Sequence, residues 1–374
     1  MKKLILLVVL MTSSAFGFNA NAEVPCYVKK DGMEGYINKK GEFVIPLKKH
    51  DWIGKQYSEG LVLIQSGREY AFYDESGKEK LSLGNRYPLV FDKFTDGLVA
   101  VQTRDGFGLI DKQGKEVVKP GIRASLVSYS GGRVVVHLPP KTSNLYANGE
   151  VEVVDLAGKV VIPRGQHAWI QPFREGVAMV WNTTTNSFLS PHGFVDTNGK
   201  ILVPLEYQAA FVPNEGVLLA ADRHQWFAFD TNGVRLFETE AQICSYFLDG
   251  LARAKDKNTG LFGFMDRNGD WSIKPIYKRC GDFSHGLAAV VVGGGKKTIP
   301  ELESVPGIEF PAVGSRFAFI DKAGKMVLTP DVVGMTADHE RPLPQCQGEL
   351  IQFKDGEKIG YMNRSGSWVW PLSN

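Results

Sequence analysis

Three short segments contain residue types that could perform chemistry. The segment 266–270 (DRNGD) begins like a calcium loop, but its Gly comes two places early and no Glu follows at the twelfth position. The segment 293–298 (GGGKKT) is similar to a phosphate-binding loop, but Val290 replaces the leading Gly and Lys297 replaces the Ser or Thr. The segment 128–132 (SYSGG) lacks the first Gly of a nucleophile elbow. These departures favour turns and a flexible loop over catalytic or binding sites.

Histidine and cysteine, the usual ligands of transition metals, are scattered along the chain. The seven histidines are His50, His137, His167, His192, His224, His285 and His339. No two of them have metal-ligand spacing on one element, and no two of the four cysteines are spaced as a ligand pair. The sequence therefore predicts no metal site and no cofactor.

The first 22 residues have the pattern of a secretory signal peptide. Lys2 and Lys3 precede an unbroken apolar run at 4–11, and 20–22 (ANA) is a small-x-small cleavage site. The apolar run is shorter than the roughly 20 residues that a membrane span requires. Val24-Pro25 before Cys26 is a poor lipidation sequence. We therefore expect cleavage after Ala22 and a mature chain, 23–374, that is periplasmic or secreted, without membrane insertion.

The mature chain is close to neutral. The full sequence has 43 Lys and Arg residues against 41 Asp and Glu residues, and loss of Lys2 and Lys3 leaves 41 of each. Proteins that bind nucleic acid present a concentrated basic surface, and this chain has no basic run or stripe. The composition therefore argues against a nucleic-acid partner.

One phrase recurs nine times along the mature chain, as in 108–120 (GLIDKQGKEVVKP) and 193–204 (GFVDTNGKILVP). Each copy has Asp or Asn three residues before a Gly. The glycines are Gly41, Gly77, Gly114, Gly158, Gly199, Gly233, Gly269, Gly324 and Gly366. An Asx residue followed by a Gly with positive φ is typical of a tight β-hairpin turn. A small residue and usually an aromatic one precede the turn, and a Pro often follows it, where we expect a strand to end.

A second phrase lies between these hairpins, as in 57–64 (YSEGLVLI) and 94–101 (FTDGLVAV). It reads as a turn that leads into an apolar strand, and 26–28 (CYV) looks like a truncated first copy. Together the two phrases resemble the WG-repeat family of bacteria over essentially all of the mature chain. The Trp that names the family is missing in every copy, and His192 and Phe262 are among its replacements. The resemblance implies a repeat architecture and a binding role, without a catalytic motif to transfer.

These repeats predict an all-β fold: a tandem array of about nine β-hairpin or meander units in the range 23–374. Each unit supplies three or four strands and cannot bury both its faces alone, so neighbouring units must stack. A propeller-like ring and an open β-superhelix both satisfy this requirement. Nine units exceed the four to eight blades of common propellers, but we favour a propeller-like curved array.

Three repeats have long insertions in the same connection, at 137–149, 181–192 and 291–315. Equivalent connections of a repeat array lie on one side, and loops held by a rigid scaffold often bind ligands. The aromatic residues that we expect to bind are Tyr146, Trp181, Phe188 and Phe310. The alternative is that a loop tip simply tolerates insertion.

The cysteines suggest two disulfides in an oxidising compartment. Cys244 and Cys280 are equivalent positions of adjacent repeats, 36 residues apart, and are expected to pair. The remaining pair, Cys26 with Cys346, requires an array whose two ends meet.

The sequence thus favours an exported, monomeric, non-catalytic protein that binds a glycan or a protein of the cell envelope. Two alternatives remain open. A hydrolase could combine acids, histidines or serines from different repeats on one face of the array, or the array could be a structural spacer.

Overall fold

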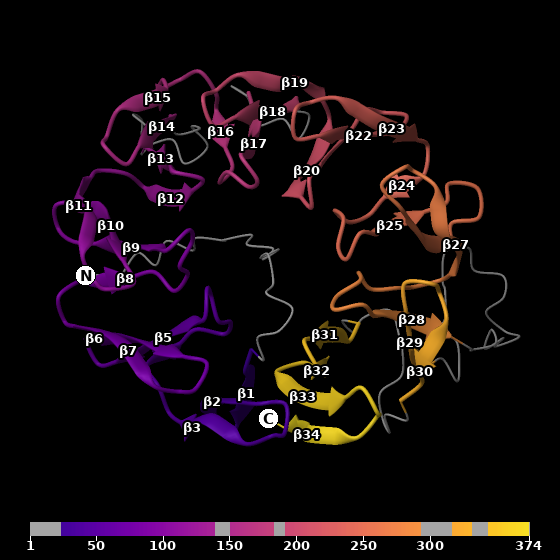
Figure 1. The fold of residues 1–374 in the computed structure, drawn as a ribbon, viewed down its shortest axis with the longest axis horizontal. Helices are drawn as coiled ribbons and strands as arrows, with labels where there is room; N and C mark the ends of the chain where they lie inside the picture. Colours follow the sequence, from indigo (N-terminus) through magenta and orange to yellow (C-terminus); the bar gives the residue numbers. More distant parts are fainter. Residues whose placement is uncertain (1–23, 139–149, 183–190, 293–315, 331–342, 374) are drawn as a thin grey trace, which may run out of the picture.

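The computed structural model describes residues 24–138, 150–182, 191–292, 316–330 and 343–373. Within these residues the chain forms nine antiparallel sheets that are arranged as the blades of a closed nine-bladed β-propeller (Figure 1). The all-β repeat array is therefore confirmed, and its ring form decides against the open superhelix.

Blade 1 contains β1 (Cys26–Lys30), β2 (Met33–Ile37) and β3 (Phe43–Lys48). Blade 2 contains β4 (Trp52–Ile53), β5 (Leu61–Ser66), β6 (Glu69–Asp74) and β7 (Glu79–Gly84). Blade 3 contains β8 (Leu89–Val90), β9 (Leu98–Gln102), β10 (Phe107–Asp111) and β11 (Glu116–Ile122). Blade 4 contains β12 (Leu126–Ser130), β13 (Arg133–His137), β14 (Val151–Asp155) and β15 (Val160–Ile162). Blade 5 contains β16 (Trp169–Ile170), β17 (Val177–Trp181), β18 (His192–Asp196) and β19 (Ile201–Tyr207). Blade 6 contains β20 (Ala209–Asn214), β21 (Val217–Ala221), β22 (Trp226–Asp230) and β23 (Arg235–Thr239). Blade 7 contains β24 (Gln242–Ile243), β25 (Ala252–Lys255), β26 (Phe262–Met265) and β27 (Trp271–Tyr277). Blade 8 contains β28 (Ala288–Val292), β29 (Arg316–Ile320) and β30 (Met326–Leu328). Blade 9 contains β31 (Gln345–Gln347), β32 (Leu350–Asp355), β33 (Lys358–Asn363) and β34 (Trp368–Ser373).

A complete blade is a four-stranded meander. Its first strand lies nearest the central axis and its fourth strand at the rim, as β20 and β23 or β31 and β34 show (Figure 1). Because consecutive strands are antiparallel, the turns between strands one and two and between strands three and four lie on one face of the ring. We call it the turn face. The other connections lie on the opposite face, which we call the insertion face.

The Asx-x-x-Gly phrase forms the hairpin between the third and fourth strands, as predicted. In blade 3, the Asp111 carboxylate accepts hydrogen bonds from the backbone amides of Gln113 and Lys115, each at 2.9 Å. Gly114 has φ of +77° and donates its amide to the carbonyl of Asp111. The same side-chain bonds recur in all nine hairpins. The repeat is therefore a locally encoded turn.

The small residue before the turn allows the fourth strand to come close, also as predicted. A Cβ atom on Gly108 would lie 2.7 Å from the Val118 carbonyl oxygen, and one on Gly193 would lie 2.6 Å from that of Val203. The expectation that Pro ends the strand is wrong in five blades, where Pro46, Pro120, Pro204, Pro275 and Pro371 lie within the fourth strand. This strand is the outer edge of its blade, so a missing amide hydrogen costs no sheet bond there.

The hydrophobic core is divided into clusters between neighbouring blades. In blades 1, 2 and 7 the aromatic residue of the hairpin packs against the aromatic residue of the next blade's second phrase. Between ring centroids, Phe72 lies 4.8 Å from Phe94 and Phe264 lies 4.6 Å from Phe283. One such cluster joins the two ends of the chain and contains Cys26, Val28, Ile37, Leu350 and Tyr361. Ordinary packing between blades 9 and 1 therefore closes the ring.

Ring closure also uses a buried hydrogen bond from a side chain of blade 9 to the backbone of blade 1. The second strand of a complete blade offers a carbonyl to its own first strand, as Ala100 does to the Phe91 amide at 3.0 Å. Blade 1 begins at its second strand, β1, among the described residues. There the Tyr361 hydroxyl of blade 9 donates to the Tyr27 carbonyl at 2.8 Å. A side chain of the last blade thus takes the place of a backbone amide.

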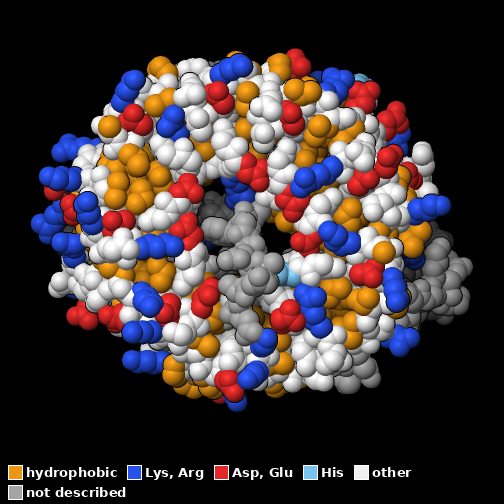
Figure 2. Space-filling view, in the orientation of Figure 1, with side chains coloured by type: hydrophobic (Ala, Val, Ile, Leu, Met, Phe, Trp, Pro, Cys, Tyr) orange, Lys and Arg blue, Asp and Glu red, His pale blue; other side chains and the backbone are white. Residues whose placement is uncertain are grey.

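On the turn face, the second phrase links neighbouring blades at five places. Its acidic residue has positive φ, and its carboxylate accepts the amide of the equivalent Gly one blade later: Glu175 from Gly216 at 2.7 Å and Glu215 from Gly250 at 2.8 Å. Glu59 and Asp249 make the same bond, whereas Asp96 accepts the amide of Gly131, one residue before the equivalent Gly. Acidic side chains gather round the central opening in the space-filling view (Figure 2). These carboxylates are committed to holding the ring together.

Candidate functional site

The three insertions leave the ring on the insertion face. Each connects a second strand to a third strand: β13 to β14, β17 to β18, and β28 to β29. Of the four aromatic residues expected to bind, Tyr146, Phe188 and Phe310 lie outside the described residues. Trp181 is described, and it forms the last residue of β17 at the base of the second insertion. The site is therefore built outward from Trp181.

Trp181 belongs to a row of aromatic side chains that runs across blade 5. The strand register aligns Trp169 with Trp181 and Trp181 with His192. The two indole rings are stacked, with centroids 5.6 Å apart and an interplanar angle of 17°. His192 lies 5.6 Å from Trp181 on the other side. From blade 4, His137 packs against Trp169 at 4.1 Å. We call these four residues the aromatic row.

The aromatic row contains polar atoms that lack partners. The indole Nε1 of Trp169 and Nδ1 of His192 are buried without a hydrogen-bond partner among the described residues. A buried donor or acceptor without a partner costs about 1–3 kcal/mol. Both indoles and His192 are nonetheless partly exposed as whole side chains. A ligand or a bound water that reached these nitrogens would recover that energy.

The histidines near the row are uncharged at neutral pH. Burial lowers the pKa of His137 to about 4, and burial is also the main cause of the lowered pKa values of His167 and His192. His167 Nδ1 lies 3.3 Å from the Asn182 side-chain oxygen, which also accepts the Ala168 amide at 3.2 Å. Asn182 thus anchors the start of the second insertion against the connection that leads into Trp169.

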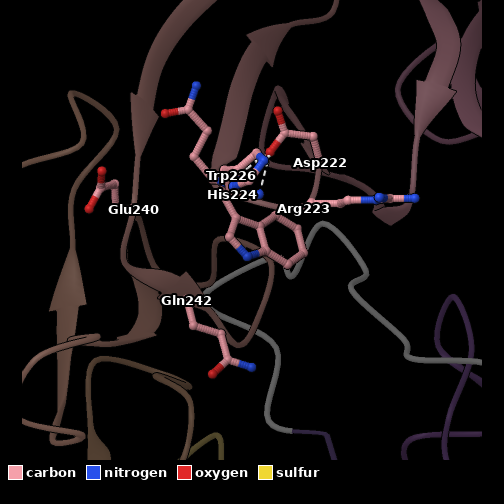
Figure 3. A pocket seen from close by; sticks show the side chains of 7 residues that line it. Asp222, Arg223, His224, Trp226, Glu240 and Gln242 are labelled. Atoms are coloured by element: carbon pink, nitrogen blue, oxygen red, sulfur yellow. Dashed lines mark hydrogen bonds between the residues drawn. The ribbon is translucent and has the colours of Figure 1, made fainter.

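A second feature of the insertion face is a hollow of about 130 Å³ between blades 6 and 7 (Figure 3). It is lined by Asp222, Arg223, His224, Gln225, Trp226, Glu240 and Gln242. The turn 222–225 is the blade 6 counterpart of the second insertion, because it connects β21 to β22. The hollow therefore lies on the same face as the aromatic row.

Three members of the aromatic row were missed by reasoning from sequence. Trp169 and His137 stand outside the two repeated phrases, so no alignment of copies draws attention to them. His192 gave a signal, because it occupies the position of the family's missing Trp. Only the register across blade 5 and the contact between blades bring these side chains to Trp181.

The three motif-like segments behave as the sequence suggested where they are described. Asp266 accepts the backbone amides of Asn268 and Asp270 in the ordinary hairpin turn. In the segment 128–132, the Ser130 hydroxyl donates to the Phe173 carbonyl of the next blade, a structural contact. The segment 293–298 lies outside the described residues. Among those described, no group of three or more His, Cys, Asp or Glu side chains is placed to hold a metal ion.

All four cysteines are free thiols in the structure. Burial raises the pKa of Cys26, Cys280 and Cys346 to about 12. Cys26 packs between blades 9 and 1 and Cys346 between blades 8 and 9, so the last blade separates them. Arg253 donates to the carbonyls of both Cys244 and Cys280, at 3.3 and 3.4 Å. The pairing of Cys244 with Cys280 and of Cys26 with Cys346 stays a prediction, which peptide mapping under non-reducing conditions would test.

The described residues contain no helix with the length and apolar character of a membrane span.

Comparison with solved structures bears on the fold alone. A eukaryotic initiation factor is 11% identical, with a TM-score of 0.56 over 94% of this chain and 98% of its own. The apo form of AztD from Citrobacter koseri is 10% identical, with a TM-score of 0.41 over 93% and 95% of the two chains. Hsv2 from Kluyvelomyces marxianus is 9% identical, with a TM-score of 0.39 over 84% and 94%.

Sequence comparison identifies the repeat. No curated protein matches the chain. A family model described as WG containing repeat matches residues 35–70, 193–221 and 262–295. These regions lie in blades 1 and 2, blades 5 and 6, and blades 7 and 8 of the propeller. The chain therefore contains segments that match the WG repeat in these three regions.

Proposed function

We propose that this protein is an exported, non-catalytic binding protein that holds its ligand on the insertion face, at the aromatic row of blades 4 and 5. The observation that carries the proposal is the stacked pair Trp169–Trp181, flanked by two histidines, at the base of two insertions. Stacked indoles give a rigid apolar surface with a polar edge, which is the composition of binding hot spots.

The chemistry of the row favours a neutral ligand. Neutral imidazoles and indole nitrogens donate or accept single hydrogen bonds but carry no charge. A glycan or a protein segment of the cell envelope offers hydroxyl or amide groups that match them. The signal peptide expected at 1–22 would deliver the protein to that compartment, and the ring-closing contacts use residues from Cys26 onward.

Capture from a cell-envelope extract tests the proposal. The immobilised chain 23–374 is compared with Trp181→Ala and with the control Trp368→Ala, which truncates an exposed Trp on the outer strand β34. We expect Trp181→Ala to reduce capture at least tenfold while Trp368→Ala retains it. Thermal melting confirms that both variants are folded. Equal capture by Trp181→Ala and the wild type would contradict the proposal.

A further inference from the structure

The hollow between blades 6 and 7 has a ligand chemistry that the aromatic row does not explain. Its floor is Trp226, whose indole ring stacks on Phe211 at 5.1 Å with an interplanar angle of 14°. Trp226 is partly exposed and lines the hollow, so part of its indole surface is accessible to a ligand. The stack also fixes the orientation of the ring, so the platform is rigid before a ligand arrives.

The acidic groups around the hollow are already engaged within the protein. The Asp222 carboxylate accepts the backbone amides of His224 at 2.7 Å and Gln225 at 2.9 Å, which lowers its pKa and keeps it ionised. Glu240 is paired with the Lys257 ammonium group. The Arg223 guanidinium group points away from the indole ring (Figure 3). We therefore do not expect this hollow to select its ligand by charge.

What remains for a ligand is a set of hydrogen-bonding side chains round an indole ring. Gln242 and Gln225 contribute side-chain amides, each with two N–H donors and one carbonyl acceptor, and His224 contributes an imidazole. The volume of about 130 Å³ is below the roughly 300–1,000 Å³ of pockets that take drug-sized ligands, so the hollow suits one small ring. A sugar ring combines an apolar C–H face, which packs on indole, with hydroxyls that bond to amides.

We propose that this hollow is a subsite for one neutral pyranose ring and that the ligand of the insertion face is an oligosaccharide. This inference rests on the proposed function, since it names the chemical class of the ligand held on that face. Trp226 supplies the stacking surface, and Gln242 and Gln225 bond to ring hydroxyls. The subsite lies on the same face as the aromatic row, between blades 6 and 7, whereas the row belongs to blades 4 and 5.

Calorimetric titration with cellohexaose, chitohexaose and maltohexaose tests the subsite. The variants are Gln242→Ala, Trp226→Ala and Trp181→Ala, with Gln113→Ala as the matched control because Gln113 is an exposed amide on the turn face. We expect the wild type to bind at least one of these neutral sugars. Gln242→Ala and Trp226→Ala should each weaken binding at least tenfold, and Gln113→Ala should not. Gln242 is exposed, so its truncation tests the subsite even if Trp226→Ala disturbs the Phe211 stack.

The outcomes separate this inference from the proposed function. If a sugar binds and Trp181→Ala weakens it while Gln242→Ala and Trp226→Ala do not, the subsite is refuted and the aromatic row stands. If none of the three sugars binds although Trp181-dependent capture persists, the saccharide class is refuted and the binding role stands. If Gln242→Ala weakens binding and Trp181→Ala does not, the subsite stands and the role of the row is refuted.

Discussion

Replacing Tyr361 with Phe should weaken the closure of the ring. The Tyr361 hydroxyl is fully buried, donates to the Tyr27 carbonyl at 2.8 Å and accepts from the Gln352 side-chain amide at 2.6 Å. Phe preserves the ring shape, and Phe72 and Phe194 occupy the equivalent position in blades 2 and 5. The substitution therefore leaves two buried polar groups without partners and creates almost no cavity.

The cost follows from those two groups. Each unsatisfied buried group costs about 1–3 kcal/mol, and local relaxation of Gln352 recovers part of the sum, so we expect a loss of about 2–4 kcal/mol in the free energy of unfolding. Urea denaturation followed by far-UV circular dichroism measures it. The matched control is Tyr73→Phe, whose hydroxyl bonds to Glu79 at 3.2 Å near the surface and should cost less than about 1 kcal/mol. If Tyr361→Phe is as stable as Tyr73→Phe, the account of ring closure is refuted.

Three further substitutions test other parts of the structure. Burial gives His137 a folded-state pKa of about 4, so as pH falls the unfolded chain takes up a proton on this histidine before the folded chain does. The contribution of His137 to the free energy of unfolding is therefore complete above about pH 6.5 and falls by up to about 3 kcal/mol towards pH 4. Urea titrations at pH 7 and pH 4 should show a smaller fall in the free energy of unfolding for His137→Gln than for the wild type. Gly199→Val should destabilise the protein by about 2 kcal/mol or more in thermal melts, because Gly199 has φ of +83° and its Cβ would lie 3.0 Å from Ile162; unchanged melting would contradict this. Glu215→Ala should cost about 1 kcal/mol in urea by removing the acceptor of the Gly250 amide, whereas no loss would show that the inter-blade bond is dispensable.

The local parts of the fold could be predicted from sequence. The hairpin turn depends on residues within five positions of one another, so Asp111 and Gly114 already specify it in the sequence. The face that carries the insertions followed from the equivalence of the repeats. Pro204 was misplaced at a strand end because sequence does not reveal that the fourth strand is an outer edge, where Pro is tolerated within the strand.

Features that depend on long-range packing could not be predicted. The contact between Tyr27 and Tyr361 joins residues 334 positions apart, and nothing in either phrase distinguishes a ring that closes from an array that stays open. The candidate site has the same difficulty. Trp181 was identified from its insertion, but Trp169 and His137 join it only through the register of blade 5 and the packing of blade 4 against it.

Hydroxyl-radical footprinting tests most directly whether ligand is held on the insertion face. The chain 23–374 is oxidised with and without a cell-envelope extract, and modification of each Trp and Tyr is measured by mass spectrometry. The account predicts that ligand protects Trp169, Trp181 and Trp226, while Trp368 on the outer rim is modified equally in both samples. Protection confined to the turn face or the rim, with Trp169 and Trp181 unchanged, would contradict it.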